Sequence, residues 1–121
     1  MTDEPFSYTT SLGSRAGVTI LKIIGPLTLN HIFTFQIDFR AMKPPTLIVD
    51  LTDCGYMDSA GLGLLMNQYV SAQAGKRKFL LAGANDRIQS LMELTRVSTI
   101  LRVYPTLADA EAEIQPLTRA V

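Results

Sequence analysis

The stretch LIVDLTDCGYMDSAGLGLL, residues 47–65, decides how this chain folds. Its first five residues are apolar except for Asp50, which predicts a short strand covered on both faces. A polar turn follows, and Asp58-Ser59 then opens a segment with the apolar spacing of a helix. The stretch therefore predicts a buried strand that runs through a turn into a helix, which is the unit from which α/β sheets are built.

The same alternation of apolar runs and helical patterns extends outward along the chain. It predicts strands at 6–12, 18–24, 47–51, 78–82 and 101–103, of which the first two form a hairpin and the last lies at or near an edge. It predicts helices at 59–74, after Asn85 and after Thr106, the last one helped to end by Pro116. The fold class is therefore α/β, with a mixed, mostly parallel sheet of four to five strands flanked by about four helices.

The segment from Leu29 to Met42 fits two structures. Phe33, Phe35, Ile37 and Phe39 alternate with polar residues as in a half-buried strand. Apolar residues also follow a helical spacing here, at positions 32, 35, 39 and 42, ahead of the Pro44-Pro45 stop. We predict a helix, because two parallel strands need a crossover of about this length.

The expected interior combines residues from the strands and helices. Within the helix 59–74 we expect one buried stripe, followed by an end at Gly75 with Lys76 and Arg77 close to the negative pole of the helix dipole. The predicted core residues are Ile20, Ile48, Val49, Leu65, Met66, Leu80 and Leu91.

Length and composition limit the classes of function that we expect for this chain. A chain of 121 residues with 47% hydrophobic and 18% charged residues predicts one folded domain, residues 1–121. Its 11 basic and 11 acidic residues balance, so neither nucleic acid nor a membrane surface is an expected partner. No export signal or membrane-spanning run is seen, and the one cysteine suits a reducing compartment, so we expect a soluble cytoplasmic protein with no metal or cofactor.

Ser59 is the residue with the most informative position. In a purely structural interpretation, Asp58 caps the helix, Ser59 is its first residue, and Gly61 and Gly63 allow tight packing on the sheet. In a functional interpretation, Ser59 is exposed at a helix N-terminus, where an added phosphate would meet free N–H groups and the positive end of the dipole. The two early glycines cost about 1 kcal/mol each relative to alanine, which suggests close approach of another backbone.

Four other polar features have simple structural interpretations. His31 fits a surface or core-edge position better than a catalytic one, and Cys54 fits a small loop filler better than a redox centre. Asp50 and Asp53 fit strand-end polarity better than cation binding. The run Lys76-Arg77-Lys78 is typical of a solvated helix end.

The order of these elements resembles the STAS family. The segment Asp58-Ser59-Ala60-Gly61-Leu62-Gly63 after the strand 47–51 resembles the family's Asp-Ser-small-Gly-Leu signature. Residues 24–27 resemble the end of its second strand, and residues 81–84 with 91–97 resemble its fourth strand and third helix. The resemblance covers about residues 16–114.

This resemblance implies an anti-sigma factor antagonist that acts by binding and has no catalytic residue. In the family, a serine-kinase anti-sigma factor phosphorylates the serine that matches Ser59, and the unphosphorylated form binds that kinase and releases a sigma factor. A metal-dependent serine phosphatase restores the binding form. The implied partner-binding residues are Asp58, Ser59, Ala60, Gly61, Leu62 and Gly63. Thr28, where many members are acidic, and Ala60, where a second serine is frequent, depart from the pattern and bear on partner identity.

Three other functions compete with this one. A serine hydrolase needs a Gly-x-Ser-x-Gly elbow and a histidine after the serine, and the chain has neither around Ser59. A receiver domain needs an acidic cluster after its first strand and a lysine after its last, where this chain has Gly13-Ser14 and Tyr104-Pro105. A STAS subunit of a lipid transporter or signalling assembly, without phosphorylation, stays open, and neighbouring genes would distinguish it.

Phe33 and Ile37 lie to one side of the predicted helix 29–42 if Ile32, Phe35 and Phe39 face the core. An exposed apolar pair indicates contact with another chain, a homodimer being one form of it. A single lateral pair of this kind also fits packing under a loop.

Overall fold

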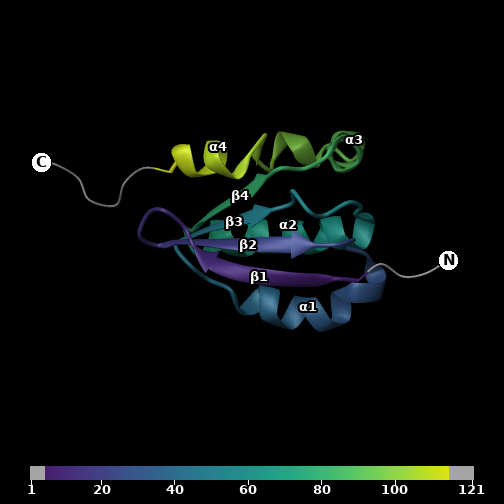
Figure 1. Cartoon of the computed structure of the whole chain (residues 1–121), viewed down its shortest axis with the longest axis horizontal. Coiled ribbons are helices and arrows are strands. Elements are labelled where there is room, and N and C mark those ends of the chain that lie inside the picture. The colour runs from purple at the N-terminus through teal and green to yellow at the C-terminus, as the bar shows by residue number, and fades with distance from the viewer. Residues whose placement is uncertain (1–4, 115–121) are drawn as a thin grey trace, which may run out of the picture.

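The protein is built around a five-stranded sheet, shown by a computed structural model that describes residues 5–114 (Figure 1). The strands follow the order β1 to β5 across the sheet. Strand β1 (Ser7–Leu12) pairs antiparallel with β2 (Val18–Ile24), and β3 (Thr46–Asp50), β4 (Lys78–Ala82) and β5 (Val103–Tyr104) each add in parallel. The predicted mixed, mostly parallel sheet, its opening hairpin and its edge position for the last strand are confirmed.

The helices form a layer on each face of the sheet. Apolar residues of α1 (Leu29–Ala41), α2 (Ser59–Ala74) and α3 (Asp86–Leu94) pack into the larger core cluster on one face. The short helix α4 (Leu107–Ala112) packs Ala110 into a second cluster with Ile20, Ile48 and Leu80 on the other face. Figure 1 shows α1 beside β1, with α3 and α4 beside β4.

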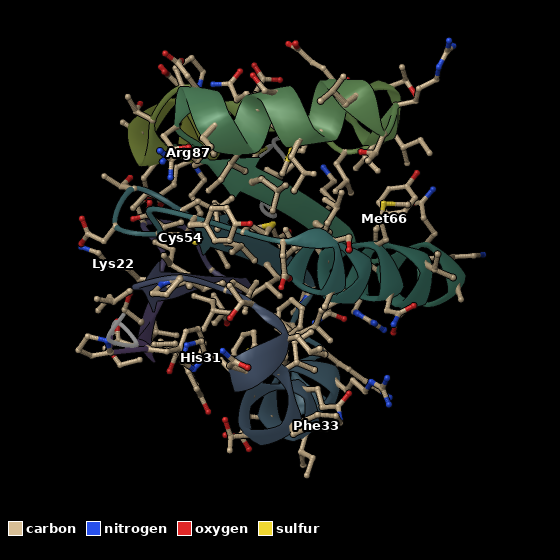
Figure 2. The ribbon with its side chains drawn as sticks, turned by 90° about the vertical axis from the view of Figure 1, so that its right-hand side faces the viewer. Lys22, His31, Phe33, Cys54, Met66 and Arg87 are labelled. Atoms are coloured by element: carbon tan, nitrogen blue, oxygen red, sulfur yellow. The ribbon has the colours of Figure 1, made fainter. Side chains whose placement is uncertain are left out.

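Helix α1 confirms the helical interpretation of the ambiguous segment. Phe35 and Phe39 are buried and stack with ring centroids 4.9 Å apart, whereas Ile32 and Met42 are half-buried at the margin of the core. Phe33 and Ile37 are 69% and 71% exposed. The strand-like alternation arises because these two residues lie outside the buried stripe of a helix, and Figure 2 shows Phe33 on the outer side of α1.

Three helix starts are capped by the predicted side chains. The carboxylate of Asp58 accepts a hydrogen bond from Gly61 N, the amide of Asn85 accepts one from Ile88 N, and the hydroxyl of Thr106 accepts one from Asp109 N. Each cap satisfies one N–H that the helix itself cannot. Gly75 ends α2 as predicted. Pro116, predicted to help end the last helix, lies outside the described residues.

Two predictions about the core and the last strand were wrong in detail. Met66 and Leu91 are half-buried and pack against the core from its margin, because the buried faces of their helices centre on Leu65 and on Met92. Figure 2 shows Met66 on the side of α2 that faces α3.

The last strand comprises Val103–Tyr104 and not residues 101–103. Leu101 is buried, but its N–H donates to the carbonyl of Val97. Residue 101 therefore still belongs to the helical turn that contains the 3₁₀ helix η1 (Val97–Thr99), and pairing with β4 begins only at Val103.

Candidate functional site

The start of α2 is held against the loop that precedes α1. Leu27 and Met57 form an isolated parallel bridge, in which Leu27 N donates to Tyr56 O at 2.9 Å and Asp58 N donates to Leu27 O at 3.3 Å. Both loops leave the carboxyl ends of neighbouring parallel strands, β2 and β3. This edge is where α/β sheets most often place their functional groups.

Asp58 caps two helices with one carboxylate. Its Oδ1 accepts a hydrogen bond from Gly61 N of α2, and its Oδ2 accepts one from Leu29 N, the first residue of α1, both at 3.0 Å. Thr28, at the N-cap position of α1, makes no side-chain cap of its own. Asp58 therefore fixes the two helix N-termini relative to each other, a role that its cap position in the sequence does not reveal.

Gly61 and Gly63 differ in their surroundings. A Cβ atom added at Gly61 would lie 2.4 Å from the carbonyl oxygen of Leu27, so only glycine fits the close approach of this backbone. A Cβ atom added at Gly63 would meet nothing within 4 Å, and this residue is exposed. The predicted close backbone approach is thus confirmed within the molecule for Gly61. The structural interpretation, in which both glycines pack tightly on the sheet, does not hold for Gly63, which faces open space.

Ser59 is exposed at the first position of α2. Within residues 5–114, its hydroxyl makes no hydrogen bond, and the N–H groups of Ser59 and Ala60 have no acceptor in the helix because they belong to its first turn. Within α2, the Asp58 carboxylate accepts a hydrogen bond only from the N–H of Gly61. The serine hydroxyl therefore lies free beside two available donors and the positive end of the helix dipole.

The surface around Ser59 includes residues that the sequence did not single out. Gly61 and Leu62 are buried and shape the site from beneath, while Asp58 and Ala60 are partly exposed. Two large apolar side chains belong to residues bonded into this helix start: Leu29, whose N–H donates to Asp58, is 56% exposed, and Tyr56, whose carbonyl accepts from Leu27 N, is 45% exposed. Leu29 and Tyr56 are brought to the same place by the pairing of two loops that lie nearly thirty residues apart in the chain. Spacing along the sequence does not show this pairing.

The other candidate residues make contacts that do not involve Ser59. Cys54 is buried, its thiol donates to Tyr56 O at 3.4 Å, and burial raises its pKa. Asp50 is buried and accepts hydrogen bonds from the N–H and hydroxyl of Thr52, and Asp53 forms an ion pair with Lys22 at 2.9 Å.

His31 stacks on Phe6 with ring centroids 5.0 Å apart, which confirms a core-edge position (Figure 2).

Among the described residues, no three acidic, histidine or cysteine side chains gather closely enough to hold a metal ion. No helix in residues 5–114 combines the length and apolar character needed to span a bilayer.

Residues 11–110 match the family model of the STAS domain. A segment of 65 residues is 37% identical to the anti-sigma-B factor antagonist of Listeria monocytogenes, covering 54% of this chain and 57% of that protein. The chain therefore spans little more than half the length of this relative.

Two solved structures show the same fold. An anti-sigma factor antagonist from Mycobacterium paratuberculosis has a TM-score of 0.77 at 24% identity, covering 92% of this chain and 97% of its own. The Bacillus cell fate determinant SpoIIAA in its phosphorylated form has a TM-score of 0.67 at 14% identity, covering 90% of this chain and 100% of its own.

Proposed function

The chain belongs to the STAS domain family, and from this premise we propose that it is an anti-sigma factor antagonist switched by phosphorylation of Ser59. The observation that carries the proposal is the exposed Ser59 hydroxyl, which has no partner in the described residues and begins α2 beside two free N–H groups. The sequence relative named as an anti-sigma-B factor antagonist supports the class of function. The phosphorylated form of a protein with the same fold supports the modification.

The unphosphorylated surface would bind a serine-kinase anti-sigma factor and so release a sigma factor. Its contact residues would be Asp58, Ser59, Ala60 and Gly63, with Leu29 and Tyr56 supplying apolar area. Gly63 leaves open space in which a partner backbone can approach the helix. Gly61 and Leu62 would act indirectly, by fixing the position of the exposed residues.

Phosphorylation would act on the complex and spare the fold. A phosphate adds nearly two negative charges, and at a helix N-terminus this change is neutral or favourable by about 0.3–1 kcal/mol. Inside an interface the same charges must lose water without a prepared partner, at a cost of about 2–5 kcal/mol. A metal-dependent serine phosphatase would then restore the binding form.

In this proposal the protein acts in the cytoplasm and catalyses no reaction itself. The phosphoryl group comes from the ATP of the kinase, and Ser59 only accepts it. The enzymes are the partners that add and remove the phosphate.

Incubation with a kinase-type anti-sigma factor of the same organism and ATP, followed by mass spectrometry, tests the proposal. We expect one phosphate on Ser59 and none on the Ser59→Ala variant. Ser90→Ala is the matched control, because Ser90 is also exposed on a helix but lies in α3. Labelling of Ser59→Ala to the wild-type level, or failure of the unmodified chain to form a complex with the anti-sigma factor, would contradict the proposal.

A further inference from the structure

A second surface feature lies at the other end of α2. A cavity of about 420 Å³ opens between the C-terminal half of α2, the first residues of β4, the edge strand β5 and the end of α4. Its volume is in the range of small-molecule sites. Ser59 begins the same helix, whose 16 residues span roughly 24 Å, so the cavity and the serine surface are separate.

The cavity exists because β5 is short. It pairs with β4 only at Leu81 and Ala82, so within residues 5–114 the segment 78–80 has no strand on its outer side. Lys78 N donates toward β3, to Pro45 O, and Leu81 N donates toward β5, to Arg102 O. Since N–H groups alternate along a strand, the Phe79 N–H points to the same side as that of Leu81, toward this gap.

Three basic side chains line the cavity, two from the junction of α2 with β4 and one from the segment before β5. They are Arg77 after α2, Lys78 at the start of β4 and Arg102 before β5, against one acidic residue, Glu113. The only ion pair within residues 5–114 joins Lys22 to Asp53, so none of the three has a carboxylate within ion-pair distance. Three positive charges against the one carboxylate of Glu113 leave the cavity with an excess of positive charge, which favours a bound anion.

The remaining lining can take an apolar group beside the charge. Tyr69, Ile100 and Tyr104 line the cavity, and Arg102 donates a hydrogen bond to the hydroxyl of Tyr104 at 3.3 Å. This contact holds a guanidinium next to an aromatic ring. Guanidinium groups bind carboxylates and phosphates through paired hydrogen bonds, and tyrosine rings pack against flat apolar groups.

We propose that this cavity binds a small organic anion, with a carboxylate or phosphate held by Lys78, Arg77 and Arg102 and a flat apolar group against Tyr69 and Tyr104. The site is independent of the proposed function, because it uses none of the residues around Ser59.

Titration of the ¹⁵N-labelled full chain, followed by NMR, tests the proposal with four probes. Phenyl phosphate and benzoate should shift the signals of the cavity residues, and the tighter of the two identifies the preferred head group. Benzyl alcohol, which lacks the charge, should bind at least about tenfold more weakly, since hydrogen bonds to charged groups contribute about that much. Inorganic phosphate, which lacks the ring, should also bind more weakly than phenyl phosphate.

Substitutions distinguish specific binding in the cavity from nonspecific electrostatic attraction to the protein surface. Lys78→Gln and Arg102→Gln should each weaken binding of phenyl phosphate about tenfold, and Glu113→Gln should strengthen it. Arg87→Gln removes the same charge from the exposed face of α3, outside the cavity (Figure 2), and should change nothing. Equal binding of benzyl alcohol, shifts scattered away from the cavity, or an effect of Arg87→Gln as large as that of Lys78→Gln would overturn the proposal.

Discussion

Asp58 and Gly61 fix where α2 begins, and Ser59 is exposed as a result. The carboxylate of Asp58 binds N–H groups of two helices, and the absence of a side chain at Gly61 lets Leu27 O approach the helix. The sequence predicts the cap and the exposed serine, because both depend on neighbouring residues. It does not predict the second bond of Asp58 to Leu29, because that bond depends on how two loops pair in the folded chain.

The two glycines of α2 give a matched pair of substitutions. Gly61→Ala should destabilise the protein by about 1–3 kcal/mol, because the new methyl group would press on the backbone carbonyl of Leu27. Gly63→Ala should stabilise it by about 0.5–1 kcal/mol, because alanine favours a helix and meets nothing there. Urea denaturation measures both changes. Equal effects of the two substitutions would show that the close contact at Gly61 is absent in solution.

At the scale of the elements, α4 is tied to the turn between β1 and β2. Glu111 accepts hydrogen bonds from the N–H and the hydroxyl of Ser14, at 2.7 and 2.6 Å, and Arg15 donates to Ile114 O at 2.6 Å. These contacts join the edge hairpin to the helix that covers the second face of the sheet. The hydrogen bonds from Ser14 lower the pKa of the Glu111 carboxyl.

The lowered pKa of Glu111 predicts a pH-dependent contribution to stability. A carboxyl group with a depressed folded pKa stabilises the protein above its unfolded value of about 4.3, and this stabilisation is lost as the pH falls through the folded pKa. The wild type should therefore be more stable than Glu111→Gln at pH 7, and the difference should shrink below about pH 4.3. Urea denaturation of both proteins, from pH 7 down to below about pH 4.3, measures this difference in stability. A difference that stays constant would show that the carboxylate charge has no part in the contact.

The elements differ in how far the sequence could predict them. The hairpin, β3, β4 and α2 follow directly from local patterns, because their apolar runs and caps are continuous in the chain. The extent of β5 does not follow from a local pattern. The sequence around residue 101 is typical of a strand, but the N–H of residue 101 bonds to the preceding helical turn. The cavity also lies beyond prediction, because Arg102 meets the basic pair Arg77 and Lys78 only where a short strand leaves β4 uncovered.

At the scale of the whole molecule, α1 carries an apolar stripe that the described chain leaves uncovered. Leu29, Phe33 and Ile37 follow a spacing of four residues, and each is more than half exposed. We propose that a second copy of the chain covers Phe33 and Ile37. Sedimentation should show a dimer that Phe33→Ser abolishes and that Thr34→Ser, on the same helix, leaves intact. A monomer at all concentrations would contradict self-association.

The central claim is that charge at Ser59 prevents binding of the anti-sigma factor without unfolding the domain. Titration calorimetry of the wild type, Ser59→Ala and Ser59→Asp against the kinase-type anti-sigma factor tests it most directly. Circular dichroism serves as the fold control, and Ser90→Asp is the matched charge control in α3. Ser59→Ala and Ser90→Asp should bind like the wild type, while Ser59→Asp should bind roughly thirtyfold to several thousandfold more weakly with an unchanged fold. Equal affinity of all four proteins would contradict the account.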